Sequence, residues 1–214
     1  MHFQHKPFIT ILLAIVVGSC DNNNNNDNYS PEYTKKVYHT PFSTIDSSIT
    51  KDEYLMEYYP NGKIESEGWI KGGRKNDYWR FYHQNGKVFK QGNYLNDLMS
   101  GWWQEFRNDS TLVFRGQYSN GKKQGFWIYF HPNGKIQKQG DFINDDMTSW
   151  WKDYNEQGNL NFEGQYSNGL KYGYSREYKN GILQSEGNYI NGRQKGTWKY
   201  YDENGKPLRI QDYD

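Results

Sequence analysis

Aromatic and glycine positions recur along this chain at a fixed spacing. An aromatic that closes one apolar run returns every 23 or 24 residues, at Tyr59, Tyr82, Phe106, Phe130, Tyr154, Tyr178 and Tyr201. A glycine in the next run returns at the same interval, at Gly68, Gly92, Gly116, Gly140, Gly164 and Gly187. A fixed period of this length is typical of a repeat array, in which each unit packs on its neighbours.

Two turn signals divide each unit into two short runs that are rich in aromatic and β-branched residues. The first signal is Asn61-Gly62, Asn85-Gly86, Asn133-Gly134, Asn180-Gly181 and Asn204-Gly205. The second is Gly72-Gly73, Asn96-Asp97, Asn120-Gly121, Asn144-Asp145, Asn168-Gly169 and Asn191-Gly192. Asn-Gly between such runs predicts a β-hairpin with a type I′ turn, which needs positive φ at both central residues. The pattern therefore predicts an all-β fold, an elongated antiparallel meander of stacked β-hairpins.

Alternation along the predicted strands sorts the side chains onto two faces. One face of the first strand carries Trp79, Trp103, Trp127, Trp151 and Trp198, with Ser175 in the equivalent place of one unit. The recurrent glycine of the second strand predicts that each indole lies over bare backbone, because glycine in a strand marks close approach. The segment 92–103 also matches 140–151, and 116–125 matches 164–173, so the duplication step is 48 residues.

Composition narrows the functional classes. Aromatics make up 18% of the chain, which fits a thin sheet better than a thick aliphatic core. The formal net charge of +1 argues against nucleic acid as a partner, for which a basic stripe is expected. Because Cys20 is the single cysteine, neither an intramolecular disulfide nor a cysteine metal cluster can form.

The N-terminal segment resembles an export signal. Residues 8–17 are apolar except for one threonine and follow a lysine, which is typical of a signal-peptide core and too short to span a bilayer. The sequence from Val17 to Cys20 resembles a bacterial lipobox, in which the cysteine is lipidated and becomes the new N-terminus. The alternatives are an ordinary signal peptide and an uncleaved anchor. We expect a signal peptide at 1–19, a lipidated Cys20 with a polar tether at 20–50, and a repeat array of six to seven units at 51–214.

The consensus G-x-[YF]-x-N-G-x-x-x-G-x-W-x-x-[YF]-x-x-N-G-K resembles the MORN-repeat variant of bacterial proteins, often labelled YwqK-family antitoxins. The clearest match is GQYSNGKKQGFWIYFHPNGK at 116–135, and the resemblance covers about residues 54–210. It implies a long antiparallel sheet of stacked hairpins that serves as a scaffold or interaction surface. The chain departs from the consensus at Ser175, Asp97 and Asp145.

The sequence offers only weak candidates for catalytic residues. We expect that the protein is not an enzyme and binds no cofactor. His83 and His131 occupy equivalent turn positions and are interpreted as structural or solvent-exposed turn residues, with a metal or acid–base role as the less favoured alternative. Glu105, Asp153 and Glu177 line the tryptophan face as a polar stripe, and paired carboxylates for glycosidase work are the less favoured alternative.

Aromatic residues outside the repeat pattern are the better binding candidates, because exposed aromatics mark interfaces. They are Trp69, Trp102, Trp150, Tyr172 and Tyr174. The leading hypothesis is a lipid-anchored scaffold of the bacterial cell envelope that binds another protein, with the inner or outer membrane left open. The alternatives are a cell-wall or carbohydrate binder and an antitoxin or immunity protein that neutralises a toxin. Unpaired terminal strands would also allow edge-to-edge dimers.

Overall fold

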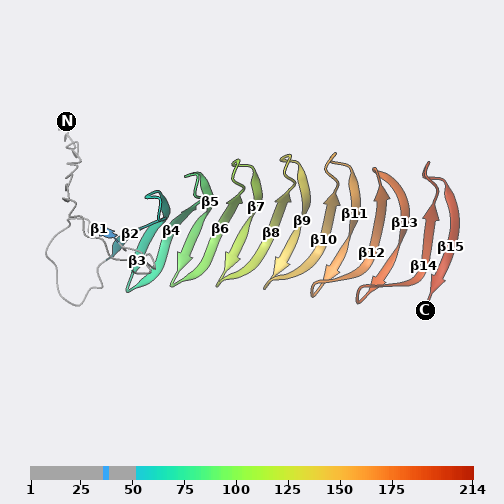
Figure 1. The fold of residues 1–214 in the computed structure, drawn as a ribbon. Helices are drawn as coiled ribbons and strands as arrows, with labels where there is room; N and C mark the ends of the chain where they lie inside the picture. The colour runs from blue at the N-terminus through green and yellow to red at the C-terminus, as the bar shows by residue number, and fades with distance from the viewer. Residues whose placement is uncertain (1–35, 39–51) are drawn as a thin grey trace, which may run out of the picture. The chain divides into compact units, whose positions relative to one another are not determined.

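A computed structural model describes residues 36–38, by their backbone alone, and residues 52–214. Together these residues form one antiparallel sheet of fifteen strands, each pairing with the next along the chain (Figure 1). No helix occurs in the described residues, and hence none there that could cross a membrane. The predicted all-β antiparallel meander is confirmed. The expected signal peptide, Cys20 and most of the tether lie outside the described residues.

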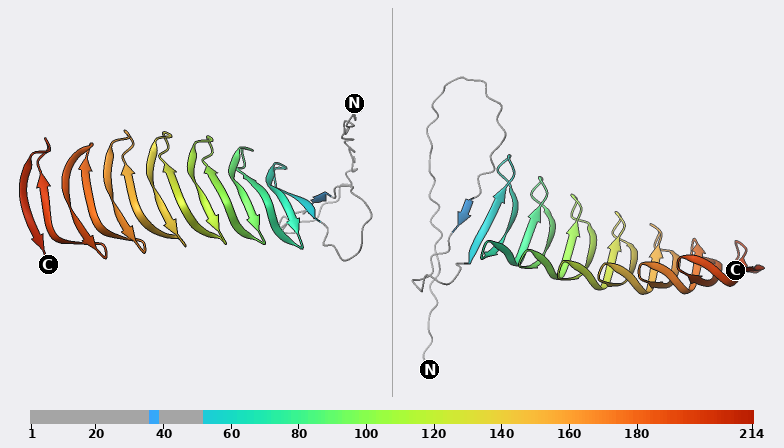
Figure 2. Two further views of the ribbon diagram at one scale, coloured as in Figure 1. Left: turned by 180° about the vertical axis from the view of Figure 1, so that it is seen from behind. Right: turned by 90° about the horizontal axis from the view of Figure 1, so that it is seen from below.

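The strands are seven to ten residues long, except for the first two. Their bounds are β1 Lys36–Tyr38, β2 Glu53–Tyr58, β3 Ile64–Lys71, β4 Arg74–Tyr82, β5 Val88–Leu95, β6 Leu98–Phe106, β7 Leu112–Ser119, β8 Lys122–Phe130, β9 Ile136–Ile143, β10 Asp146–Tyr154, β11 Leu160–Ser167, β12 Leu170–Lys179, β13 Ile182–Ile190, β14 Arg193–Tyr201 and β15 Pro207–Tyr213. The even strands from β4 to β14 contain the tryptophan position, and the odd strands from β3 to β13 contain the recurrent glycine. Figure 2 shows the same hairpins from two further sides.

The two-residue turns along one edge of the sheet join neighbouring units. Asn96 and Asp97 have φ of 51° and 69°, as the predicted type I′ turn requires. The Asp97 N–H donates to the Lys75 carbonyl of the preceding unit (2.9 Å), and the Asp97 carboxylate accepts the Lys75 N–H (2.7 Å). Asp145 makes the same pair of bonds to Lys123. Aspartate at these turns therefore adds a link between units that the glycine turns lack.

The turns along the other edge differ from the prediction. At Asn85-Gly86 only the glycine has positive φ, at 88°, and the Gly86 N–H donates to the His83 carbonyl at 2.8 Å. This is a four-residue turn whose last residue is the left-handed glycine, and the Asn85 side chain accepts the Lys87 N–H at 2.9 Å. The type I′ prediction is therefore wrong for Asn61-Gly62, Asn85-Gly86, Asn133-Gly134 and Asn204-Gly205, whose glycines alone have positive φ, and correct for Asn180-Gly181.

Every tryptophan strand contains a bulge two residues before the tryptophan position. In β6, Trp103 pairs with Gly92 and Ser100 with Asn93, so Gly101 and Trp102 have no partner of their own on β5. The residue with positive φ at this bulge is Asp77, Gly101, Gly125, Ser149, Gly173 or Gly196. A bulge bends the strand and redirects the side chains beside it.

The core is a row of indoles on one face, here called the core face. Trp79, Trp103, Trp127, Trp151 and Trp198 are fully buried. A Cβ added at Gly116 would lie 2.2 Å from Trp127 Cδ2, which confirms that the indole lies on bare glycine backbone. Each indole N–H donates to the carbonyl of the residue ten positions earlier, as Trp127 does to Gln117 at 3.1 Å. The bulge and the indole thus fix each other in place.

Ser175 replaces tryptophan in one unit, and a neighbouring ring fills the space. Ser175 is fully buried, and Phe162 is only 6% exposed. A Cβ on Gly164 would lie 2.2 Å from Ser175 Oγ and 2.7 Å from the Phe162 ring, so serine and phenylalanine together cover the glycine that an indole covers elsewhere. The core face therefore stays continuous through this unit.

Lysines cover the core face at the 48-residue step. The Nζ atom of Lys75 lies 4.5 Å from the Trp79 ring centre, that of Lys123 lies 4.9 Å from Trp127, and that of Lys171 lies 4.0 Å from Phe162. These are cation–π distances, and the aliphatic stems of such lysines can cover apolar rings. The duplication step seen in the sequence therefore corresponds to alternating covered units.

Candidate binding site

The face opposite the indoles, here called the open face, carries a row of exposed aromatic side chains. The exposed ones occupy the bulge position directly before a tryptophan: Tyr78, Trp102, Phe126 and Trp150. In the last two units the same position holds the half-buried Tyr174 and then Thr197. Trp102 is 55% exposed, Phe126 46% and Tyr78 41%. Adjacent residues of a strand point to opposite faces, so the burial of each indole directs its predecessor outward.

The candidate residues fall at separate places on the sheet. Trp69 lies on β3 and makes an edge-to-face contact with Tyr54, with ring centres 5.2 Å apart. Trp102 on β6 and Trp150 on β10 are four strands apart, or ~19 Å at the usual strand spacing. Tyr172 is exposed, whereas the Tyr174 hydroxyl donates to Glu186. The five residues therefore do not form one small-molecule pocket, although an extended partner could contact several.

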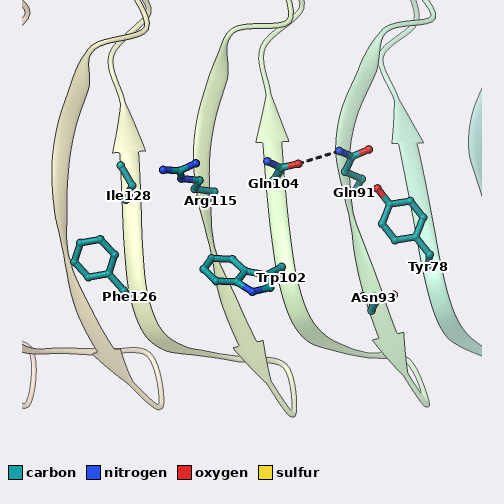
Figure 3. A pocket seen from close by; sticks show the side chains of 8 residues that line it. All are labelled: Tyr78, Gln91, Asn93, Trp102, Gln104, Arg115, Phe126 and Ile128. Carbon is teal, nitrogen blue, oxygen red and sulfur yellow. Dashed lines mark hydrogen bonds between the residues drawn. The ribbon is translucent and has the colours of Figure 1, made fainter.

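Trp102 does line a groove, together with residues that were not among the predicted binding candidates. The groove has a volume of about 630 Å³ and crosses β4 to β8 (Figure 3). Its lining consists of Tyr78, Gln91, Asn93, Trp102, Gln104, Arg115, Phe126 and Ile128. Tyr78 and Phe126 had a detectable signal, since each is an aromatic directly before a repeat tryptophan.

Charges on the open face form an ordered row along the C-terminal half of the sheet. Arg176 on β12 lies 3.4 Å from Glu163 on β11 and 3.4 Å from Glu186 on β13. Lys152 and Lys199 extend the row on β10 and β14, at 3.7 Å from Glu163 and 3.8 Å from Glu186. Tyrosine hydroxyls from the same face also donate to both glutamates. This half of the face satisfies its own charges.

The part of this row that lies in the groove contains no ion pair among the described residues. The cross-strand partners there are Gln91, Gln104, Arg115 and Ile128, in that order along the sheet. Gln91 donates its side-chain amide to Gln104 at 3.0 Å, the bond drawn in Figure 3. Arg115 is exposed and makes no ion pair with any described residue. The groove therefore holds a guanidinium whose neighbours in the row are an amide and an isoleucine.

The turn histidines have structural partners. His83 Nε2 lies 2.9 Å from the Phe106 carbonyl, and His131 Nε2 lies 2.8 Å from the Tyr154 carbonyl. Arg107, in the equivalent slot, donates to the Phe130 carbonyl at 2.8 Å. At these three turns the residue ties the turn to the next unit, whereas Asn155 and Asp202 in the same slot accept N–H groups of their own turns. No cluster of metal-ligating side chains occurs within residues 52–214.

Titratable groups of the core face are perturbed mainly by burial. Burial raises the pKa of Tyr118 and of Tyr129 to about 12. It also raises the pKa values of Glu105 and Asp153, which nearby lysines oppose. The Asp153 Oδ1 atom is buried without a hydrogen-bond partner among the described residues. Glu105 and Asp153 lie on strands four apart (β6 and β10), ~19 Å, which is too far for a glycosidase pair. Asp153 and Glu177 lie on strands two apart (β10 and β12), ~10 Å, at the upper limit of such a pair.

Five segments of the chain match the model of the MORN repeat variant, at residues 55–68, 78–96, 123–144, 174–191 and 194–214. The molecule is therefore a β-sheet repeat protein, and these five segments of it are similar to the MORN repeat variant. Repeats of this kind are often involved in binding. No curated protein sequence matches the chain.

Two solved structures of TarM share limited similarity. A mutant of S. aureus TarM in complex with Fondaparinux, alpha-GlcNAc-glycerol and UDP is 18% identical over 44% of this chain and 19% of that chain, with a TM-score of 0.30. A second TarM structure is 12% identical over 52% of this chain and 21% of that chain, with a TM-score of 0.28. The chain spans about a fifth of the length of these proteins, and likeness at such TM-scores carries no statement about function.

Proposed function

We propose that this protein is a non-enzymatic binding scaffold whose open face receives another protein, and that lipid on Cys20 holds it in the bacterial cell envelope. The observation that carries the proposal is the row of exposed aromatics at the bulges, above all Trp102 at 55% exposure. Tryptophan, tyrosine and arginine dominate the binding energy of protein interfaces. All three types line the groove.

Rigidity supports the same function. Each of the four exposed open-face aromatics precedes a fully buried indole whose N–H is bonded to backbone. Binding residues that are already fixed lose little conformational entropy on association. The successive groove aromatics stand two strands apart, ~10 Å, which suits a partner that lies across several strands.

The test is crosslinking capture from envelope fractions of the native cell with tagged full-length protein. The double variant Trp102→Ala and Trp150→Ala is expected to lose a protein that the wild type recovers reproducibly. Leu95→Ala is the matched control, because this side chain is 54% exposed but sits beside a two-residue turn. Equal recovery by the wild type and the double variant, or no recovered protein, would contradict the proposal. A recovered toxin would assign the antitoxin or immunity role.

A carbohydrate is the second candidate occupant. The specific observation is that the exposed Trp102 ring stands among the side-chain amides of Gln91, Asn93 and Gln104. An aromatic face and amide groups together can contact a sugar ring and its hydroxyls. Titration with cell-wall glycans should then quench the tryptophan fluorescence in the wild type and not in Trp102→Phe. Unchanged fluorescence across the glycans would exclude this candidate.

A further inference from the structure

The cation Arg115 occupies a position that is filled differently in the duplicated half of the sheet. The residue 48 positions later is Glu163, which lies within ion-pair distance of a cation on each neighbouring strand, Lys152 and Arg176. The neighbours of Arg115 in the same row are Gln104 and Ile128. The sign of the central charge is therefore reversed in the first half, and the charges that would balance it are missing.

We propose that the partner protein supplies the missing charge, as an aspartate or glutamate side chain that binds Arg115 between Trp102 and Phe126, next to an apolar side chain that packs on Ile128. This inference rests on the proposed function and names the chemistry of its partner. The occupant is an extended protein segment that carries an acidic residue beside an apolar one.

The geometry of the groove favours such a carboxylate. Arg115 is on β7, and the strands on either side carry Trp102 on β6 and Phe126 on β8. Figure 3 shows Gln104, Arg115 and Ile128 at about one level, with the two rings one row nearer the two-residue turns. A guanidinium can bind a carboxylate with two parallel hydrogen bonds. Flanking rings would exclude water from that contact and strengthen it.

The isoleucine distinguishes a protein segment from an acidic polysaccharide. In the row between the apolar Met56 on β2 and Ile210 on β15, Ile128 is the one apolar side chain, and it stands directly across from Arg115. A uronic acid polymer has a carboxylate but no aliphatic side chain to cover Ile128. A polypeptide provides both groups within two residues.

The test uses an array of dodecapeptides that differ only at a central residue, Asp, Glu, Asn or Lys, with leucine two positions away. Full-length wild-type protein should bind the Asp and Glu peptides at least about tenfold more tightly than the Asn peptide, as a hydrogen-bonded charge pair predicts. Arg115→Gln should abolish this preference and Arg115→Lys should keep part of it. Lys122→Gln makes the same change in net charge at an exposed position beside a turn, and should leave the preference intact.

Three outcomes would overturn the inference. The first is that the Asp and Asn peptides bind equally tightly, or that no peptide binds. The second is a preference that survives in Arg115→Gln. The third is binding of polygalacturonate, rather than of any peptide, that depends on Arg115. Capture of a protein that needs Trp102 but is unaffected by Arg115→Gln would refute the carboxylate and leave the scaffold function standing, whereas failure of capture would refute the scaffold itself.

Discussion

Replacing Gly116 by alanine tests the packing that holds the sheet together. The new Cβ would lie 2.2, 2.3 and 2.6 Å from Trp127 Cδ2, Cε2 and Cγ, where ordinary contact begins at 3.4 Å. The indole would have to retreat by about 1 Å, but it is fully buried and bonded to the Gln117 carbonyl. Overpacking of this kind costs about 1–3 kcal/mol.

Two further contributions determine the net change in the free energy of unfolding. Loss of the indole hydrogen bond would add about 1 kcal/mol. In the opposite direction, alanine restricts the unfolded chain and favours folding by about 0.4–1 kcal/mol where the backbone can accept it. The φ of Gly116 is not positive, so this opposing contribution applies. We expect a net loss of about 1–4 kcal/mol in the free energy of unfolding.

Urea unfolding followed by circular dichroism measures this loss, with Ser119→Ala on the same strand as the control because Ser119 is exposed. The decisive comparison is a double-mutant cycle with Trp127→Leu. If the clash with the indole is the cause, Gly116→Ala should cost little or become stabilising in that background. A wild-type or higher stability for Gly116→Ala, or an equal cost in both backgrounds, would refute the reasoning. Ser175 shows that the sheet accepts a smaller residue at the tryptophan position.

Three other predictions follow from burial and from the N-terminal sequence. Asp153→Asn should stabilise the protein at pH 7, because burial raises the pKa of Asp153 and the folded state then carries an unfavourable charge. The urea midpoints of the variant and the wild type should converge below about pH 3, where the aspartate is protonated in both the folded and the unfolded state. The free energy of unfolding should fall as the pH rises from about 10 towards 12, because tyrosines lose their protons near pH 10 in the unfolded chain whereas burial raises the pKa of Tyr118 and Tyr129 to about 12. Tyr129→Phe should make this decline less steep in a series of unfolding curves measured at different pH. Metabolic labelling with a fatty-acid analogue should mark the wild type and not Cys20→Ala, and label that persists in the variant would disprove lipidation at this residue.

The pairing of strands could be anticipated from local sequence because its determinants lie close together. Turn pairs such as Asn120-Gly121 specify a two-residue hairpin through the φ values they allow. The spacing of Gly116 and Trp127 already indicated that an indole lies on glycine across one hairpin. Both features depend on residues within about one repeat, so the 24-residue pattern contains them.

The bulges could not be anticipated in the same way. Glycine recurs at 101, 125, 173 and 196, but Asp77 and Ser149 hold the same conformation in the other two units. Their positive φ is imposed by the buried indole on one side and the register of the neighbouring strand on the other. Alternation with the buried indole directs Tyr78 and Phe126 to the opposite face, but the register at each bulge decides which residues of the next strand lie beside them.

By itself, the sequence determined the repeat length, the all-β meander, the core face and the interpretation of the turn histidines as structural. Only the tertiary structure decided which side chains share the open face, since that depends on the register of every strand pair. Arg115 is one of several cations in the sequence, and its distinct character appears when β6 and β8 place Gln104 and Ile128 beside it. Charge balance is a property of neighbours across strands, and those neighbours are set by the summed pairing and bulges of successive units rather than by any local pattern.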